Sequence, residues 1–392
     1  MSMAIVLSYE RRVEASIVQD AQRKHGASGV VDAAVAELRA APLLALLVFV
    51  PIVILTEFTS PDSHTLLFIL SVLAIVPLAA LLSRATEAVS ARTGDAVGGL
   101  LNATLGNLTE LVISLAALQA GQYLLVKASI AGAIVTNTLF MLGGSFLLGG
   151  LRHHLQEFNR VSARFQASLL FLATVALFVP SLVSRADQGP EMVQALSLGL
   201  AVILIAVYAM GMLFSLKTHR ELFASVGETE EQHGAWSLST SITVLIVVTL
   251  FVALISEVFV GSVQAAAEKM GMTPAFVGFI VVALVGAAAE MTAAFSAARA
   301  NRLDLSVGIA LGSASQIALF VAPVLVILSY VIGPEPMSLQ FWPGAVAMMF
   351  LAMMAATLLS SGGHGAWYVG VLALAVYAIF GLTLFLLPPA AS

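Results

Sequence analysis

The chain has 392 residues, of which 60% are hydrophobic and 10% are charged, and its formal net charge is -5. This composition excludes an ordinary soluble globular protein and indicates a polytopic membrane protein. The absence of cysteine excludes disulfides and thiolate metal sites, and no basic arm is present that would predict nucleic-acid binding.

Residues 1–40 carry charges every few positions and lack the apolar core and cleavage site of a signal peptide. They predict a cytoplasmic N-terminal segment that is retained. Residues 41–62 predict an additional first transmembrane helix. Apolar runs long enough to cross about 30 Å of hydrocarbon begin near eleven positions, which are residues 41, 65, 95, 125, 163, 193, 237, 273, 305, 341 and 366.

The lysines and arginines predict the orientation of these spans. An N-terminus inside the cell puts fourteen of the seventeen on the cytoplasmic side, and only Lys127, Arg185 and Lys269 fall outside. Cytoplasmic loops of membrane proteins carry an excess of basic residues. The sequence therefore predicts a cytoplasmic N-terminus, and the compact chain with its short loops favours a bacterial inner membrane over an organelle.

An internal repeat predicts the architecture. Shifting the sequence by 180 residues superposes like residues in four places, namely Gly98 on Gly278, Ala103 on Ala283, Gly106 on Gly286 and Glu110 on Glu290. The first copy enters the membrane from the cytoplasm and the second enters from outside, so the repeat is inverted. The expected fold is an all-α polytopic membrane protein with eleven transmembrane helices, in which residues 63–216 and 237–392 form two inverted five-helix repeats after the extra N-terminal helix.

Residues 217–236 separate the two repeats and predict a cytoplasmic linker. This linker contains Glu228, Glu230 and Glu231. An acidic run of this kind is usually a solvated face, although a weak regulatory cation site is an alternative that stays open.

Two acids lie well inside predicted spans, Glu110 and Glu290, while Glu87 and Glu257 lie nearer the ends of others. An aspartate at the centre of a bilayer costs about 2.5 to 3.5 kcal/mol on insertion scales, so an acid at this depth predicts function. The structural alternative is a protonated glutamate that is hydrogen-bonded within the bundle. Two acids related by an inverted repeat favour a site, because such repeats bring two broken helices together near the midplane.

Residues near the two acids supply further oxygen atoms. Asn107 and Thr109 adjoin Glu110, and Gly106 and Gly286 each precede their acid by four residues, where a break would free a backbone carbonyl. The fourth span and its counterpart in the second half add polar groups, which are Ser129, Thr136 and Asn137 in one and Ser306, Ser313, Ser315 and Gln316 in the other. Small and hydroxylated residues also mediate ordinary helix packing. Together, however, they predict an oxygen-lined cavity.

Three blocks of sequence carry a resemblance to a known family. They are GGLLNATLGNLTELVISLAAL, KASIAGAIVTNTLFMLG and DLSVGIALGSASQIALFVAP. With them the chain resembles the cation/proton exchanger family, best known for calcium/proton antiport, over spans two to eleven. The first block fits the family's GNxTEL signature at residues 106–111. In the second half the chain has Ala287 and Met291 where the family usually has an asparagine and a histidine, and Val369 stands where an acid is expected.

The resemblance implies an antiporter in which Glu110 and Glu290 are shared ligands of the cation and the proton. The leading hypothesis is exchange of Ca²⁺, or a similar divalent cation, for protons by alternating access. No cofactor is expected, since Ca²⁺ and H⁺ are the transported ions. The expected partners are these ions and the lipid bilayer, and assembly as a homo-oligomer is left open.

The sequence also leaves other functions open. Exchange of Na⁺ or K⁺ for protons is the nearest alternative, because Ala287 and Met291 remove two ligands or proton carriers. An intramembrane enzyme is disfavoured, since the chain has no His-Glu-x-x-His motif and no aspartate deep in a span. An ion channel or a structural protein is the remaining alternative, and a channel would pass current without moving protons.

Overall fold

The computed structural model describes residues 42–93, 95–183, 189–222 and 236–387. The predicted cytoplasmic segment, residues 1–40, and the three linker acids Glu228, Glu230 and Glu231 lie outside the described residues. What is described is mostly helical and contains a single two-stranded sheet. The predicted all-α class is therefore confirmed.

The helices of residues 42–222 follow one another with short connections. They are η1 (Pro42–Val48), α3 (Phe49–Thr59), α4 (His64–Arg92), α5 (Asp95–Leu105), α6 (Leu108–Gln119), α7 (Tyr123–Val135), η2 (Thr136–Met141), α8 (Leu142–His153), α9 (Arg160–Val183), α10 (Pro190–Leu213), η4 (Phe214–Thr218) and η5 (Arg220–Leu222). Several neighbours continue into one another without a gap, so that α7, η2 and α8 together form one long helix with a π-helical segment in its middle.

The helices of residues 238–386 repeat much of this order. They are α11 (Leu238–Lys269), α12 (Pro274–Phe276), η6 (Val277–Val282), α13 (Ala283–Gly286), α14 (Ala288–Arg299), α15 (Leu303–Gln316), η7 (Ile317–Val321), α16 (Ala322–Ile332), α17 (Pro343–Ser360) and α18 (Trp367–Leu386). Here α15, η7 and α16 form the long helix with a π-helical middle. Such π-helical segments are frequent at functional sites.

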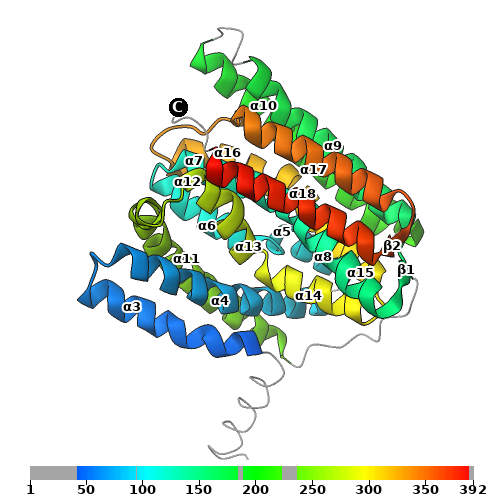
Figure 1. Ribbon diagram of the computed structural model, residues 1–392, viewed down its shortest axis with the longest axis horizontal. Coiled ribbons are helices and arrows are strands. Elements are labelled where there is room, and N and C mark those ends of the chain that lie inside the picture. The colour runs from blue at the N-terminus through cyan, green and yellow to red at the C-terminus, as the bar shows by residue number, and fades with distance from the viewer. Residues whose placement is uncertain (1–41, 94, 184–188, 223–235, 388–392) are drawn as a thin grey trace, which may run out of the picture.

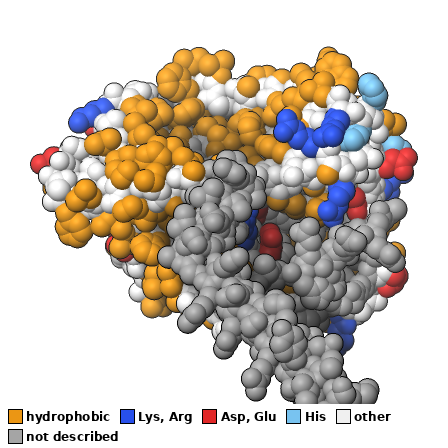
Figure 2. Space-filling model, turned by 90° about the horizontal axis from the view of Figure 1, so that it is seen from below, with side chains coloured by type: hydrophobic (Ala, Val, Ile, Leu, Met, Phe, Trp, Pro, Cys, Tyr) orange, Lys and Arg blue, Asp and Glu red, His pale blue; other side chains and the backbone are white. Residues whose placement is uncertain are grey.

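Eight helices in the described part of the chain are long and apolar enough to cross a membrane, and ten are if each of two bent pairs is one span. The apolar helix Leu43–Thr59 is shorter. Large side chains such as Val202, Leu250 and Leu358 are more than half exposed, and apolar side chains cover much of the face shown in Figure 2. This surface suits hydrocarbon rather than water.

The bent helices lie between two outer groups of straight ones. Helix α4 packs along α11, and α3 packs against α4, at one edge of the molecule, whereas α9, α10 and α17 lie at the opposite edge (Figure 1). The bent pair α5 and α6 and the bent pair α13 and α14 lie between these edges. The site described below is therefore held away from the lipid-facing surface.

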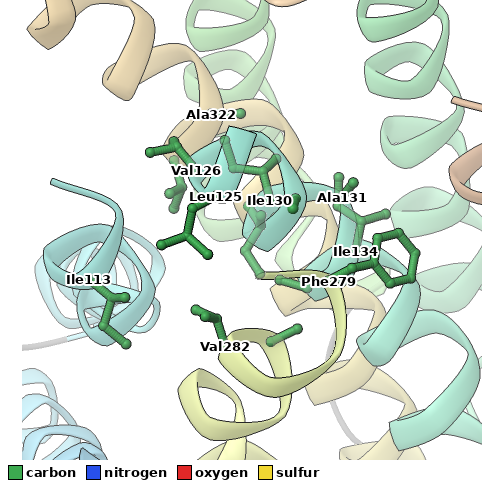
Figure 3. Close-up of a cluster of buried hydrophobic side chains, with 14 of the residues drawn as sticks. Ile113, Leu125, Val126, Ile130, Ala131, Ile134, Phe279, Val282 and Ala322 are labelled. Atoms are coloured by element: carbon green, nitrogen blue, oxygen red, sulfur yellow. The ribbon is translucent and has the colours of Figure 1, made fainter. Parts of the chain in front are cut away.

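Small residues let the two halves approach closely in the core. A Cβ atom added at Gly132 of α7 would lie 2.1 Å from the backbone oxygen of Phe279 in η6. A Cβ at Gly278 would lie 2.6 Å from Cβ of Ala128. Buried side chains including Ile130, Ile134 and Phe279 pack around this crossing (Figure 3). Close contact through small residues is a common way to pack helices in membranes.

A short sheet joins two loops that are far apart in sequence. Strand β1 (Leu155–Glu157) follows α8, and it pairs antiparallel with β2 (His364–Ala366), which precedes α18. Helices α8 and α18 also pack against each other. These strands were not predicted from the sequence, because a strand of three residues at the end of a loop is too short to show a periodic pattern.

Candidate functional site

Two helices of the core are broken at glycines. Helix α5 ends just before Gly106, and α6 begins after Asn107 with a bend of 41°. Helix α13 ends at Gly286, and α14 begins after Ala287 with a bend of 58°. The breaks therefore fall where the repeated glycines predict them, and each leaves backbone groups at the break without their helical partners.

Each break is followed by an acid in the first turn of the next helix. Glu110 lies in the first turn of α6, and Glu290 lies in the first turn of α14. A helix N-terminus carries a partial positive charge that stabilises a carboxylate near it. This local arrangement lowers the cost of holding a charged glutamate in the membrane interior.

The two broken helices meet at the acids. A Cβ atom added at Gly286 would lie 3.0 Å from Cγ and 3.1 Å from Oε1 of Glu110. Gly106 and Glu290, in turn, line the same cleft. Glu110 is thus brought next to the break in the other half, where an alanine in place of Gly286 would press on its side chain.

A chain of amide and hydroxyl groups surrounds the acids. Nδ2 of Asn107 donates a hydrogen bond to Oε1 of Gln316 (2.6 Å), and the Ser313 hydroxyl donates to Oδ1 of Asn107 (2.8 Å). Nδ2 of Asn137 donates to the Ser313 hydroxyl oxygen (2.8 Å). These bonds join α15 to η2 and to the break before α6. Four of the predicted site residues therefore form one connected network.

Among the described residues, three side-chain oxygen atoms at the broken helices and the neighbouring η2 are buried and have no hydrogen-bond donor. They are Oε1 of Glu110, Oε2 of Glu290 and Oδ1 of Asn137. A buried acceptor without a donor costs about 1 to 3 kcal/mol, and more for a charged group. Carboxylate and amide oxygens are the ligands that hard cations prefer. The free oxygen atoms are therefore suited to coordinate a cation.

The donor set consists of two acids and neutral oxygens. Over the described ranges, no group of three or more His, Cys, Asp or Glu side chains is placed to hold a metal ion. Two ionised carboxylates would carry the charge of one divalent cation, and uncharged oxygens would complete its coordination. Such a site is poorer in charge than a dedicated high-affinity metal site.

A cleft of about 310 Å³ reaches Glu290. Near the acids it is lined by Gly106, Glu290, Ser313 and Gln316, whereas Glu110 is not among its lining residues. Its far end is lined by residues at the starts of α9 and α15, namely Asn159, Ser162, Asp304 and Leu305. This end adjoins the loops that the basic residues predict to be cytoplasmic.

The remaining predicted site residues lie nearby but outside the network. Thr109 is buried beside Glu110. The Ser315 hydroxyl donates a hydrogen bond to Oε1 of Gln166 on α9 (2.7 Å). Gln166 was not predicted from the sequence, and neither was Asn102, which lines the cleft one helical turn before Gly106. The spacing of Asn102 from Gly106 was a signal that could have indicated it.

A family model described as sodium/calcium exchanger protein matches residues 63–217 and 240–386, which together make up most of the chain. The chain belongs to this family. The two matched segments each contain one broken helix and its acid. The predicted resemblance to cation/proton exchangers is confirmed at this level.

Close relatives carry more specific names. The chain is 40% identical over 360 residues to the Ca(2+)/H(+) antiporter of Aphanothece halophytica, which covers 88% of this chain and 96% of that protein. It is also 40% identical over 324 residues to the Ca(2+)/H(+) antiporter ChaA of Bacillus subtilis, covering 82% of this chain and 92% of that protein. The solved structure of native YfkE is 35% identical with a TM-score of 0.77, covering 88% of this chain and all of that one.

Two residues of the second half that depart from the family pattern, Ala287 and Met291, have apolar surroundings. Ala287 is fully buried at the second break, at the position that corresponds to Asn107 in the first. Met291 is partly buried and packs against a cluster that includes Met141 and Val307. The second half thus has apolar contacts where the family usually has an amide and an imidazole.

Proposed function

We propose that this protein is a secondary antiporter that exchanges Ca²⁺, or a similar divalent cation, for protons, with Glu110 and Glu290 as the shared ligands. The observation that carries the proposal is the meeting of two broken helices at two glutamates with three buried, unpaired oxygen atoms. The names of the relatives support Ca²⁺ as the first cation to test.

In the proposed mechanism the divalent cation and the protons bind to the same carboxylate oxygens. When both carboxylates are ionised, their charge balances one divalent cation, and Oδ1 of Asn137 adds a neutral ligand. When protons bind the carboxylates, the negative charge is lost and the cation is released. Cation and proton therefore exclude each other, which is the basis of coupled exchange.

In this proposal the network around the acids acts as a fixed frame. Asn107 is bonded through both ends of its amide, to Gln316 and Ser313, so it orients the first turn of α6 and leaves the free oxygens to Glu110 and Asn137. The cleft gives ions access to Glu290. Exchange across the membrane then requires a second conformation open to the other side, in which α4 and α11 move relative to the site.

The proposal includes the membrane arrangement that the sequence predicts. It has eleven spans, two inverted repeats at residues 63–216 and 237–392, and a cytoplasmic N-terminus in a bacterial inner membrane. It is supported by the occurrence, in each half, of a bent helix pair and of a long helix with a π-helical segment in its middle. Under this orientation the cleft opens toward the cytoplasm.

Exchange of a monovalent cation for protons is the second candidate. It is favoured by the apolar surroundings of Ala287 and Met291, which leave the second half with fewer ligands than the first. Charge argues against it, since two carboxylates leave one Na⁺ or K⁺ undercompensated.

The test is transport by the purified full-length protein in liposomes with an imposed proton gradient, with Ca²⁺, Na⁺ and K⁺ supplied in turn. We expect Ca²⁺ uptake that dissipates the proton gradient, and we expect Glu110→Gln and Glu290→Gln each to lower it more than about a hundredfold, because either change removes a charge that both ions need. The exposed acid Glu268 supplies the control variant Glu268→Gln, which should transport normally. Exchange supported by Na⁺ or K⁺ but not by Ca²⁺ would favour the second candidate, and near-normal transport by either glutamine variant would overturn the shared site.

A further inference from the structure

The last helix of each half carries the same short sequence around a tyrosine. Residues 206–209 of α10 and residues 375–378 of α18 both read Ala-Val-Tyr-Ala. Tyr208 and Tyr377 are 6% and 7% exposed, whereas Tyr368 on α18 is 58% exposed. Tyrosines of membrane helices often lie at the lipid–water interface. These two are instead buried, so an interfacial role does not explain them.

The two tyrosine rings pack across the halves in equivalent ways. The ring of Tyr208 lies 5.5 Å from that of Phe320 in η7, and the ring of Tyr377 lies 5.1 Å from that of Phe140 in η2. Phe140 and Phe320 are themselves related by the 180-residue shift. Each half therefore places its last helix against the π-helical segment of the other half.

The tyrosine hydroxyls contact two segments next to the proposed ion site, the end of α5 and the start of η2. The Tyr208 hydroxyl donates a hydrogen bond to the backbone oxygen of Ala103 (2.7 Å), three residues before the break at Gly106. The Tyr377 hydroxyl lies 3.1 Å from the hydroxyl oxygen of Thr136, which directly precedes Asn137. One hydroxyl thus contacts the end of the first broken helix, and the other contacts the neighbour of an amide with a free, buried oxygen.

We infer that Tyr208 and Tyr377 are paired positioning residues of the ion site, Tyr208 holding the end of α5 and Tyr377 holding Thr136 so that Oδ1 of Asn137 faces the cation. The inference rests on the proposed function for the location of the site. It assigns a role in cation affinity to two residues that do not touch the cation.

The reason is geometric. A π-helical turn contains one residue more than a regular α-helical turn, so the directions of its side chains differ from those of a regular helix. Contacts with neighbouring helices then help to set these directions. The ring of Tyr377 packs on Phe140 within η2 and its hydroxyl bonds to Thr136 in the same segment. These two contacts fix the rotation of η2 about its axis, and that rotation sets the direction of the Asn137 side chain.

The first experiment removes the contact from either side. Tyr377→Phe deletes the hydroxyl and keeps the ring, and Thr136→Val deletes its partner at nearly constant volume. We expect each to raise the half-saturating Ca²⁺ concentration about threefold to tenfold, as loss of one net hydrogen bond predicts, with the maximal rate within about twofold of wild type. The double variant should match the single variants, because both remove the same bond.

The matched control is Tyr368→Phe, which removes a hydroxyl from an exposed tyrosine of the same helix and should leave affinity unchanged. Tyr208→Phe should raise the half-saturating concentration in the same direction as Tyr377→Phe. A merely structural role would lower thermal stability without changing the Ca²⁺ dependence. Unchanged affinity in Tyr377→Phe, or additive effects in the double variant, would overturn the inference for Tyr377, and unchanged affinity in Tyr208→Phe would overturn the pairing.

A second measurement separates this inference from the proposed function. Equilibrium binding of Ca²⁺, Na⁺ and K⁺ to the purified protein reports affinity even if no proton-coupled exchange occurs. If wild type exchanges Ca²⁺ for protons and Glu110→Gln abolishes this, but neither tyrosine variant changes binding, only the tyrosine inference fails. If wild type binds one of the three cations without exchanging it for protons, the proposed function fails, and weaker binding of that cation by Tyr377→Phe still supports the positioning role.

Discussion

The two halves of the site are built from the same parts, but they have different surroundings. In each half a glycine ends one helix and a glutamate occupies the first turn of the next. Glu110 is buried away from the cleft and is accompanied by the amide of Asn107, whereas Glu290 lines the cleft and has Ala287 at the equivalent place. Two equivalent acids therefore differ in access and in polarity.

Two halves built from similar helices can therefore differ in the path to their acids. If both halves had the same conformation, Glu110 would line a cleft equivalent to the one at Glu290. Only one of the two acids lines this cleft, because the halves have different packing around similar helices.

The largest expected effect is in access to the two acids from the cleft. The protein has no native cysteine, so single cysteines can be introduced without background. Ala293 is exposed and lines the cleft, and its equivalent under the 180-residue shift, Ile113, is 2% exposed. We expect Ala293→Cys to react with a water-soluble thiol reagent more than about a hundredfold faster than Ile113→Cys, because the buried residue reacts only after local opening.

Labelling in denaturant is the control, since both variants should then react to completion. Addition of the reagent from one side of oriented vesicles also tests the membrane arrangement, with the cytoplasmic side expected to react. Equal rates for the two cysteines would mean that the halves do not differ in access.

An intermediate effect is expected where one half contacts the acid of the other. Gly286→Ala would place a methyl group about 3.0 Å from Cγ of Glu110. Overpacking of this kind costs about 1 to 3 kcal/mol, so we expect the half-saturating Ca²⁺ concentration to rise about fivefold or more. The measurement is initial Ca²⁺ uptake in liposomes over a range of Ca²⁺ concentrations.

Gly312 provides the matched control for this change. It lines the cleft, and no atom lies within 4 Å of the position of an added Cβ. Gly312→Ala should therefore transport like wild type. If Gly312→Ala and Gly286→Ala weaken transport equally, the effect of Gly286→Ala does not come from its contact with Glu110.

The smallest effect is expected from restoring a polar group in the second half. Met291→His introduces a group that titrates near neutrality, one residue from Glu290. We expect the midpoint of the transport-versus-pH curve to move by up to about one pH unit, measured at a fixed gradient. Thr292→His, at an exposed position of the same turn, is the control and should not move the midpoint. An active Met291→His protein with an unchanged midpoint would mean that residue 291 lies outside the proton path.

Sequence reasoning identified the acids and the breaks because both depend on local composition. A glutamate in an apolar run is costly wherever the chain folds, and a glycine weakens a helix without reference to distant residues. The repeat then linked the two acids at long range. Hydropathy in the same way indicated where most helices begin, such as α4 at His64 and α11 at Leu238.

The partners within the site were not predictable in the same way. Asn107 contacts Gln316 across 209 positions of sequence, and Tyr208 contacts Ala103 across 105. Both ends of the Asn107 amide are hydrogen-bonded to side chains, whereas Oδ1 of Asn137 has no donor among the described residues. Which of several polar groups is left unpaired depends on distances of a few tenths of an ångström, and no spacing along the chain contains that information.

Local sequence was enough to indicate a helical membrane protein with two glutamates, each shortly after a glycine, because the cost of burying charge and the preference for apolar surface in lipid are properties of each residue. Only the folded chain shows that Glu290 and not Glu110 lines the cleft, and that the hydroxyls of Tyr208 and Tyr377 contact Ala103 and Thr136. Both results arise from how whole helices pack against one another, and packing is decided by the fit of all surfaces together rather than by any one segment.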